Sequence, residues 1–118
     1  MTPSENKEIV RKINKGFASG DTEAILEHIA DDVRWDIPGF STAIGKEAFR
    51  KEIHNENFQG LPTITVTNDI AEGDYVAVEG EVKALTKNGA PFDAFFHNKY
   101  RLEDGKVKHM TSYLVVKQ

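Results

Sequence analysis

The sequence has no cysteine among its 118 residues, so it can form neither a disulfide nor a thiolate metal site. A cysteine nucleophile is excluded for the same reason. Long apolar runs are also missing: no segment approaches the roughly 20 apolar residues of a membrane helix. Residues 1–7 have no apolar core like that of a signal peptide. We therefore expect a cytoplasmic protein without a membrane partner.

Basic residues are few and scattered. Fifteen Lys and Arg stand against nineteen Asp and Glu, which gives a net charge of -4 at pH 7. Proteins that bind nucleic acid usually carry a basic patch, so we expect no nucleic-acid partner. The sequence also has no Gly-rich phosphate loop and no pair of histidines at the short spacing of a metal motif. We therefore expect neither a cofactor nor a metal site.

Length and composition are those of one ordinary globular domain. Apolar residues make up 39% of the chain and charged residues 29%, without a bias that indicates disorder. A chain of this length supports one hydrophobic core and not two. We therefore expect a single domain over residues 1–118.

The first half of the chain is predicted to be mainly helical. Thr2 and Glu5 have the spacing of a capping box, and apolar residues recur at helical spacing up to a stop at residues 19–20. A second helix is predicted from Asp21 to Ile29, and a third from Gly45 to about Gly60.

The remaining segments alternate between apolar and polar residues and are predicted to be strands. A short strand follows the second helix and ends at Pro38-Gly39, and Asn88-Gly89 is typical of a tight hairpin turn. Because three helices alternate with only one strand before a terminal run of strands, the predicted class is α+β. The predicted strands cover residues 33–37, 63–70, 76–84, 92–102 and 106–116.

The last two predicted strands have one face that is almost entirely apolar. Asn98 is the only amide or charged residue of its own strand on this face. A turn at residues 103–105 that pairs Leu102 with Lys106 would place Asn98 opposite Met110, and Phe96 opposite Ser112. A mostly apolar concave surface with a few polar groups is typical of a small-molecule site. The predicted ligand-binding residues are Ile13, Phe17, Trp35, Ile37, Phe96, Asn98, Tyr100, Met110, Ser112 and Leu114.

A structural role is an alternative for many of these residues. The Asn98 amide would serve equally well to satisfy a neighbouring backbone group or a buried water. Ser112 would also fit as an ordinary small strand residue. Simple core packing is the favoured role of four others, namely Phe17, Trp35, Ile37 and Met110.

The opposite face of the same two strands mixes aromatic and polar residues. It is predicted to carry Phe95, Val107, Tyr113 and Val115 among histidines and basic residues. Interfaces combine aromatic anchors with polar groups in this way, and an isolated exposed apolar patch is unusual on a monomer. We therefore expect a homodimer that forms through this outer face. The alternative is that an open, twisted sheet leaves the face partly exposed to solvent.

Two segments resemble the SnoaL-like and ketosteroid-isomerase-like proteins of the nuclear transport factor two-like superfamily. The first runs from Ala18-Ser19-Gly20-Asp21 to Trp35-Asp36-Ile37-Pro38-Gly39. The second is Tyr100-Arg101-Leu102-Glu103-Asp104-Gly105-Lys106-Val107, followed by Ser112-Tyr113-Leu114. The resemblance implies a cone-shaped, cystatin-like roll, in which three N-terminal helices pack on a curved, mostly antiparallel sheet.

The resemblance also implies where catalytic groups would lie. In steroid isomerisation an aspartate moves the proton while a tyrosine and a protonated aspartate donate hydrogen bonds to the enolate oxygen, which is a worked case of this family's chemistry. Here the tyrosine position falls on Ile13, the base position on Ile37 and the third position on Asn98. Asp36 is adjacent to the base position, but strand alternation turns it to the other face. Ordinary ketosteroid isomerase activity is therefore not expected, and Asn98, followed by Asp36, is the catalytic candidate.

Three functions remain open on the sequence. The first is an isomerase, cyclase or hydratase-type enzyme on a small cyclic or polyketide-like carbonyl compound, in which Asn98 stabilises negative charge. The second is a non-catalytic protein that binds a small apolar molecule in the same pocket. The third is a dimerisation domain that has no pocket. All three remain open because the fold alone does not determine the function.

Overall fold

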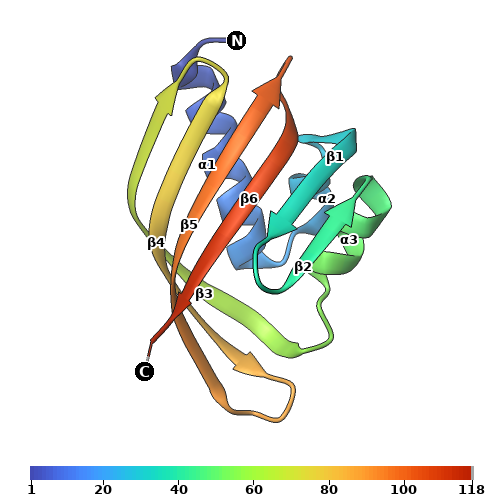
Figure 1. Cartoon of the computed structure of the whole chain (residues 1–118), viewed down its shortest axis with the longest axis vertical. Helices are drawn as coiled ribbons and strands as arrows, with labels where there is room; N and C mark the ends of the chain where they lie inside the picture. Colours follow the sequence, from blue (N-terminus) through green and yellow to red (C-terminus); the bar gives the residue numbers. More distant parts are fainter. Residues whose placement is uncertain (118) are drawn as a thin grey trace.

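The computed structural model of the protein describes residues 1–117. It contains three helices and six strands in one sheet of order β2-β1-β6-β5-β4-β3, in which only the β1–β6 pair is parallel (Figure 1). The predicted α+β class, with three helices on a mostly antiparallel sheet, is confirmed. The elements are α1 (Pro3–Ser19), α2 (Thr22–Leu26), β1 (Ile29–Ile37), β2 (Ser41–Ile44), α3 (Lys46–Ile53), β3 (Phe58–Glu72), β4 (Tyr75–Thr86), β5 (Pro91–Glu103) and β6 (Lys106–Val116).

The first helix begins and ends as its sequence predicts. The Thr2 hydroxyl accepts a hydrogen bond from the Glu5 backbone N–H at 3.1 Å, and the Glu5 carboxylate accepts one from the Thr2 N–H at 2.9 Å. Gly20 ends the helix at φ 72°, a conformation that glycine adopts without strain. The apolar stripe of α1 packs against β3 and β4. Within residues 1–117, no helix combines the length and apolarity needed to span a membrane.

Several element boundaries differ from the prediction. The second helix ends at Leu26, and Ile29 instead begins β1, where it pairs with Val107 and is 1% exposed. The third helix ends at Ile53, and β3 begins at Phe58 rather than at residue 63. The short strand β2 was not predicted. It exists because the Pro38-Gly39 turn reverses the chain, so that four residues pair with β1.

The register of β5 and β6 also differs from the prediction, by two residues. The ladder shifts between Arg101 and Leu102, where Lys108 has no partner on β5. Asn98 therefore lies opposite Ser112, rather than opposite Met110. An even shift keeps every side chain beyond the irregularity on its predicted face. Near the turn the shift is odd, which turns Val107 from the predicted outer face into the core, where it is fully buried.

Gly80 lies in the middle of β4. Its partner strand β3 has a ladder irregularity between Val66 and Asn68. A Cβ atom on Gly80 would collide with the carbonyl oxygen of Thr65 and lie 3.0 Å from Cε2 of Phe96. The close approach of β3 and the position of the Phe96 ring therefore both require glycine here. Figure 1 shows β3, β4 and β5 curving past the end of α1.

We predict that Gly80→Ala lowers the free energy of unfolding by about 2 kcal/mol or more, because β3 must move away from the added methyl group. Chemical denaturation measures this change. Gly73→Ala is the matched control, since no atom lies within 4 Å of its added Cβ and only its φ of 57° is unfavourable. That control should cost about 1 kcal/mol. Equal costs for the two variants would contradict the close-approach explanation.

Candidate functional site

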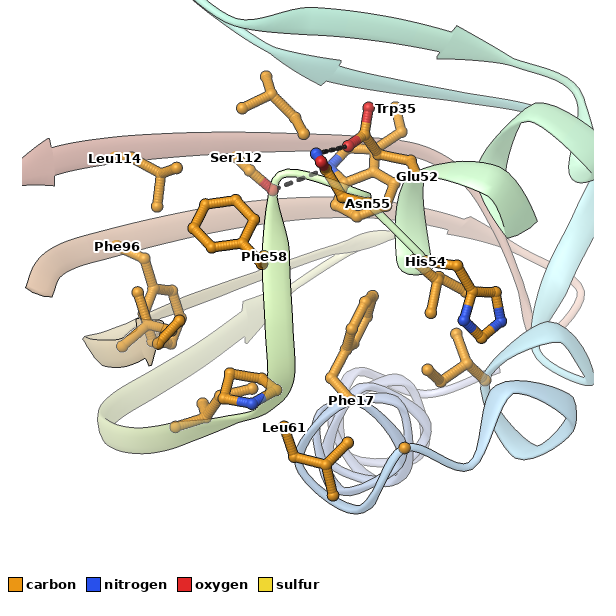
Figure 2. Close-up of a pocket in the computed structure, with 18 of the residues that line it drawn as sticks. Phe17, Trp35, Glu52, His54, Asn55, Phe58, Leu61, Phe96, Ser112 and Leu114 are labelled. Carbon is orange, nitrogen blue, oxygen red and sulfur yellow. Dashed lines mark hydrogen bonds between the residues drawn. The ribbon is translucent and has the colours of Figure 1, made fainter. Parts of the chain in front are cut away.

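A cavity of about 570 Å³ lies between the sheet, the end of α1 and the segment that joins α3 to β3. Its walls are mainly apolar. Figure 2 shows Phe17 rising into it from α1, Phe58 and Leu61 on the β3 side, and Phe96 and Leu114 on the sheet. The cavity has six aromatic lining residues, which are Phe17, Trp35, Phe40, Phe58, Phe92 and Phe96.

The structure brings most of the predicted ligand-binding residues into this one cavity. Ile13 and Tyr100 are the exceptions, since both are fully buried in the core and do not line it. Ile13 is too far toward the start of α1, because the cavity begins at Asn14. The predicted residues that do line the cavity are Phe17, Trp35, Ile37, Phe96, Asn98, Met110, Ser112 and Leu114.

Asn98 belongs to a cluster of three polar side chains, which we call the amide cluster: Asn14, Asn98 and Tyr100. The Nδ2 of Asn98 donates to the Tyr100 hydroxyl at 3.4 Å, and that hydroxyl donates to Oδ1 of Asn14 at 3.3 Å. Burial raises the pKa of Tyr100, so the phenol keeps its proton and remains a donor. Both amides line the cavity. Among the described residues, the Asn14 amide N–H groups have no protein acceptor, and Asn14 itself lines the cavity.

Asn14 was not among the predicted site residues. The available signal was its spacing, since Asn14 lies three residues before Phe17 and thus on the same side of the helix. A polar residue at the margin of an apolar helical stripe is usually solvated, and the sequence does not show that this margin faces a cavity.

A second polar group lines the cavity beside Trp35. The Glu52 carboxylate accepts hydrogen bonds from the Ser41 hydroxyl and from Nδ2 of Asn55, both at 2.8 Å. We call Ser41, Glu52 and Asn55 the carboxylate cluster. Close by, Nε1 of Trp35 donates to the Ser112 hydroxyl at 2.9 Å (Figure 2). Glu52 was not among the site residues that the sequence predicted. The structure turns it toward the cavity and leaves it only partly exposed.

Asp36 lies outside the cavity, on the other face of the sheet, as strand alternation predicts. Its carboxylate accepts hydrogen bonds from Arg34 at 2.9 Å and from Thr42 at 3.0 Å. It also contacts Nε2 of His109 at 2.8 Å. The hydrogen bond from Arg34, followed by that from His109, holds the pKa of Asp36 well below its usual range. Asp36 is therefore an ion-pair partner on the outer face and does not reach an occupant of the cavity.

Metal-binding groups do not gather in the part of the chain that the structure describes. No three histidine, aspartate or glutamate side chains in residues 1–117 lie close enough to hold an ion. His54 lines the cavity, but its Nε2 contacts the Thr22 hydroxyl at 3.0 Å.

The comparisons with known proteins agree with this architecture. A model of the SnoaL-like domain family matches residues 10–110. An NTF2-like protein of unknown function from Burkholderia pseudomallei superposes with a TM-score of 0.86 at 22% identity, over 98% of this chain and 92% of that chain. An LEH-like epoxide hydrolase from M. tuberculosis gives 0.84 at 14% identity, over 96% and 84%.

A putative ketosteroid isomerase from Kribbella flavida gives a TM-score of 0.81 at 19% identity, over 98% of this chain and 82% of that chain. No curated protein matches the sequence significantly. At these identities the structural likeness shows the fold alone.

Proposed function

Because the chain belongs to the SnoaL-like domain family, whose model spans most of its length, we propose that it binds a small, largely apolar organic molecule in the cavity. The observation that carries this proposal is the cavity itself. Its volume of about 570 Å³ is within the range of small-molecule sites. Its apolar walls would desolvate the body of a ligand, and its few polar groups would orient it.

The lining argues against a purely structural domain. A core without a site would be filled by its own side chains. Here Trp35, Asn98 and Ser112, which come from three different strands, all line one cavity. Partly unpaired amides in such a cavity are more useful to a ligand than to folding, because a buried amide without a partner costs free energy.

We predict that the protein binds a neutral naphthalene fluorophore at one site per chain, and that Ala84→Trp weakens this binding at least about tenfold. Ala84 lines the cavity, so an indole there would occupy the ligand's volume. Fluorescence titration measures the affinity. The matched control is Lys83→Trp, which adds the same side chain to the exposed side of β4. Equal weakening by both variants, or by neither, would place binding elsewhere.

Catalysis on a carbonyl compound is the second candidate function. The amide cluster favours it, because amide N–H groups at a cavity wall can stabilise negative charge that develops on a carbonyl oxygen. An isomerase, cyclase or hydratase-type reaction on a small cyclic ketone fits this arrangement. Asn98 would be the donor, and Asn14 a second donor that the sequence did not predict.

If this candidate is correct, Asn98→Leu should lower kcat/KM by about 100-fold, since one donor to the developing charge is lost. NMR with a panel of small cyclic ketones measures turnover. Binding of the neutral fluorophore should change little, which separates lost chemistry from a damaged site. The absence of turnover by the wild-type protein across the panel would leave the binding function alone.

We also propose that the protein is a homodimer that forms through the outer sheet face. Phe95, Tyr113 and Val115 are 50%, 49% and 65% exposed, and they lie together because Phe95 pairs with Val115 across β5 and β6. Aromatic and aliphatic side chains at this exposure favour burial against a second copy. We call these three residues the outer patch.

Val115→Asp should shift the protein from dimer to monomer in sedimentation equilibrium, because a carboxylate would be buried without a partner in the interface. Val116→Asp is the matched control. Val116 is the next residue of β6, is 47% exposed and points to the opposite face. A wild-type protein that sediments as a monomer would contradict the proposal.

A further inference from the structure

Among residues 1–117, carboxylates line the cavity, whereas lysine and arginine do not. These carboxylates belong to Glu52 and Glu56. The chain has fifteen basic residues, so their absence from this wall is not a consequence of composition. An anionic occupant would find no fixed cation to pair with its charge.

The Glu52 carboxylate is fixed in place by neutral donors only. Ser41 and Asn55 each donate one hydrogen bond to it, at 2.8 Å. These bonds orient the carboxylate without neutralising it. Figure 2 shows the group beside the indole of Trp35 and close to Ser112, on the wall of the cavity. A negative charge thus lies where one end of an occupant would lie.

The aromatic rings that line the same cavity favour the same sign of ligand charge. The Phe17 and Trp35 rings lie 5.9 Å apart in an edge-on arrangement, and the Phe58 and Phe92 rings lie 5.1 Å apart. All four residues line the cavity. The faces of aromatic rings carry negative potential and attract cations, tryptophan most strongly.

We propose that the occupant of the cavity is a small organic cation, either a protonated amine or a quaternary ammonium with apolar substituents. Its charge lies beside Glu52 and Trp35, and its apolar body lies along the aromatic walls. An amine N–H donates to the Glu52 carboxylate, whereas a quaternary ammonium relies on the carboxylate charge and the ring faces. The proposal rests on the proposed binding function and names its ligand class.

Three naphthalene compounds of similar size test this proposal. They are 2-naphthylmethylamine, 2-naphthylmethanol and 2-naphthoate, which are cationic, neutral and anionic at pH 7. Displacement of the neutral fluorophore from the full-length protein measures their affinities. We expect the amine to bind about tenfold more tightly than the alcohol, and the naphthoate to bind most weakly. The corresponding trimethylammonium compound should retain most of the amine's advantage if ring faces contribute.

Glu52→Gln should reduce the amine's advantage over the alcohol to less than about threefold, while the alcohol itself binds at least as tightly as before, because the neutral amide costs less to desolvate than the carboxylate. Retained alcohol binding also shows that the variant is folded. Glu56→Gln is the matched control. Glu56 lines the same cavity, but it is exposed to solvent, so its removal should leave most of the preference.

The outcomes separate the two proposals. If the alcohol binds as tightly as the amine, or the naphthoate binds most tightly, the cation proposal is wrong and the binding site stands. If the preference survives Glu52→Gln, Glu52 is not its source and the proposal is also overturned. If neither the fluorophore nor any of the three compounds binds, the proposed function itself fails.

Discussion

The constraint on which the rest of the structure depends is a mismatch of length between the sheet and the helix that covers it. The 17 residues of α1 span about 25 Å at 1.5 Å per residue. The 15 residues of β3 span about 50 Å when extended. One helix therefore covers only part of the sheet (Figure 1). The uncovered part must either be filled by other segments or enclose a cavity, and the segment between α3 and β3 closes it only partly.

Curvature turns this uncovered part into a cavity with walls. A flat sheet would leave it open to solvent, whereas the ladder irregularities of β3 bend this long strand, and Gly80 allows it to approach β4 closely. The bend is coupled to the lining, because the atom that a side chain on Gly80 would displace next is a ring carbon of Phe96. The same glycine thus serves the curvature of the sheet and the position of an aromatic wall residue.

The sequence predicted those parts of the fold that depend on local chemistry. The cap at Thr2, the stop at Gly20 and the alternation of β5 each follow from neighbouring residues. It could not predict what depends on long-range pairing. Lys108 has no ladder partner on β5, and no local pattern in the sequence encodes this irregularity. The inner face was nevertheless predicted correctly beyond Lys108, because the shift there is even.

The site was predictable where a strand defines it and less so where a helix does. The alternation of side chains along a strand assigned Phe96, Asn98 and Ser112 to one face, whatever their position along the cavity. On α1, the position along the helix determines whether a residue lines the cavity, and the cavity begins one residue after Ile13. Glu52 was missed because a charged helical residue is usually solvated, and only the packing of α3 beside β2 brings it to the cavity.

The position of Glu52 finally determines what kind of molecule can fill the cavity at low cost. An empty cavity leaves water beside the carboxylate, which then needs no further partner. An occupant removes that water, and Ser41 and Asn55 supply hydrogen bonds but no charge. A neutral apolar occupant would therefore desolvate an unpaired carboxylate, which is costly. A cation that displaces this water replaces the lost hydration of the carboxylate with a charge–charge interaction. The desolvation of Glu52 therefore opposes the binding of neutral and anionic ligands but not that of cations.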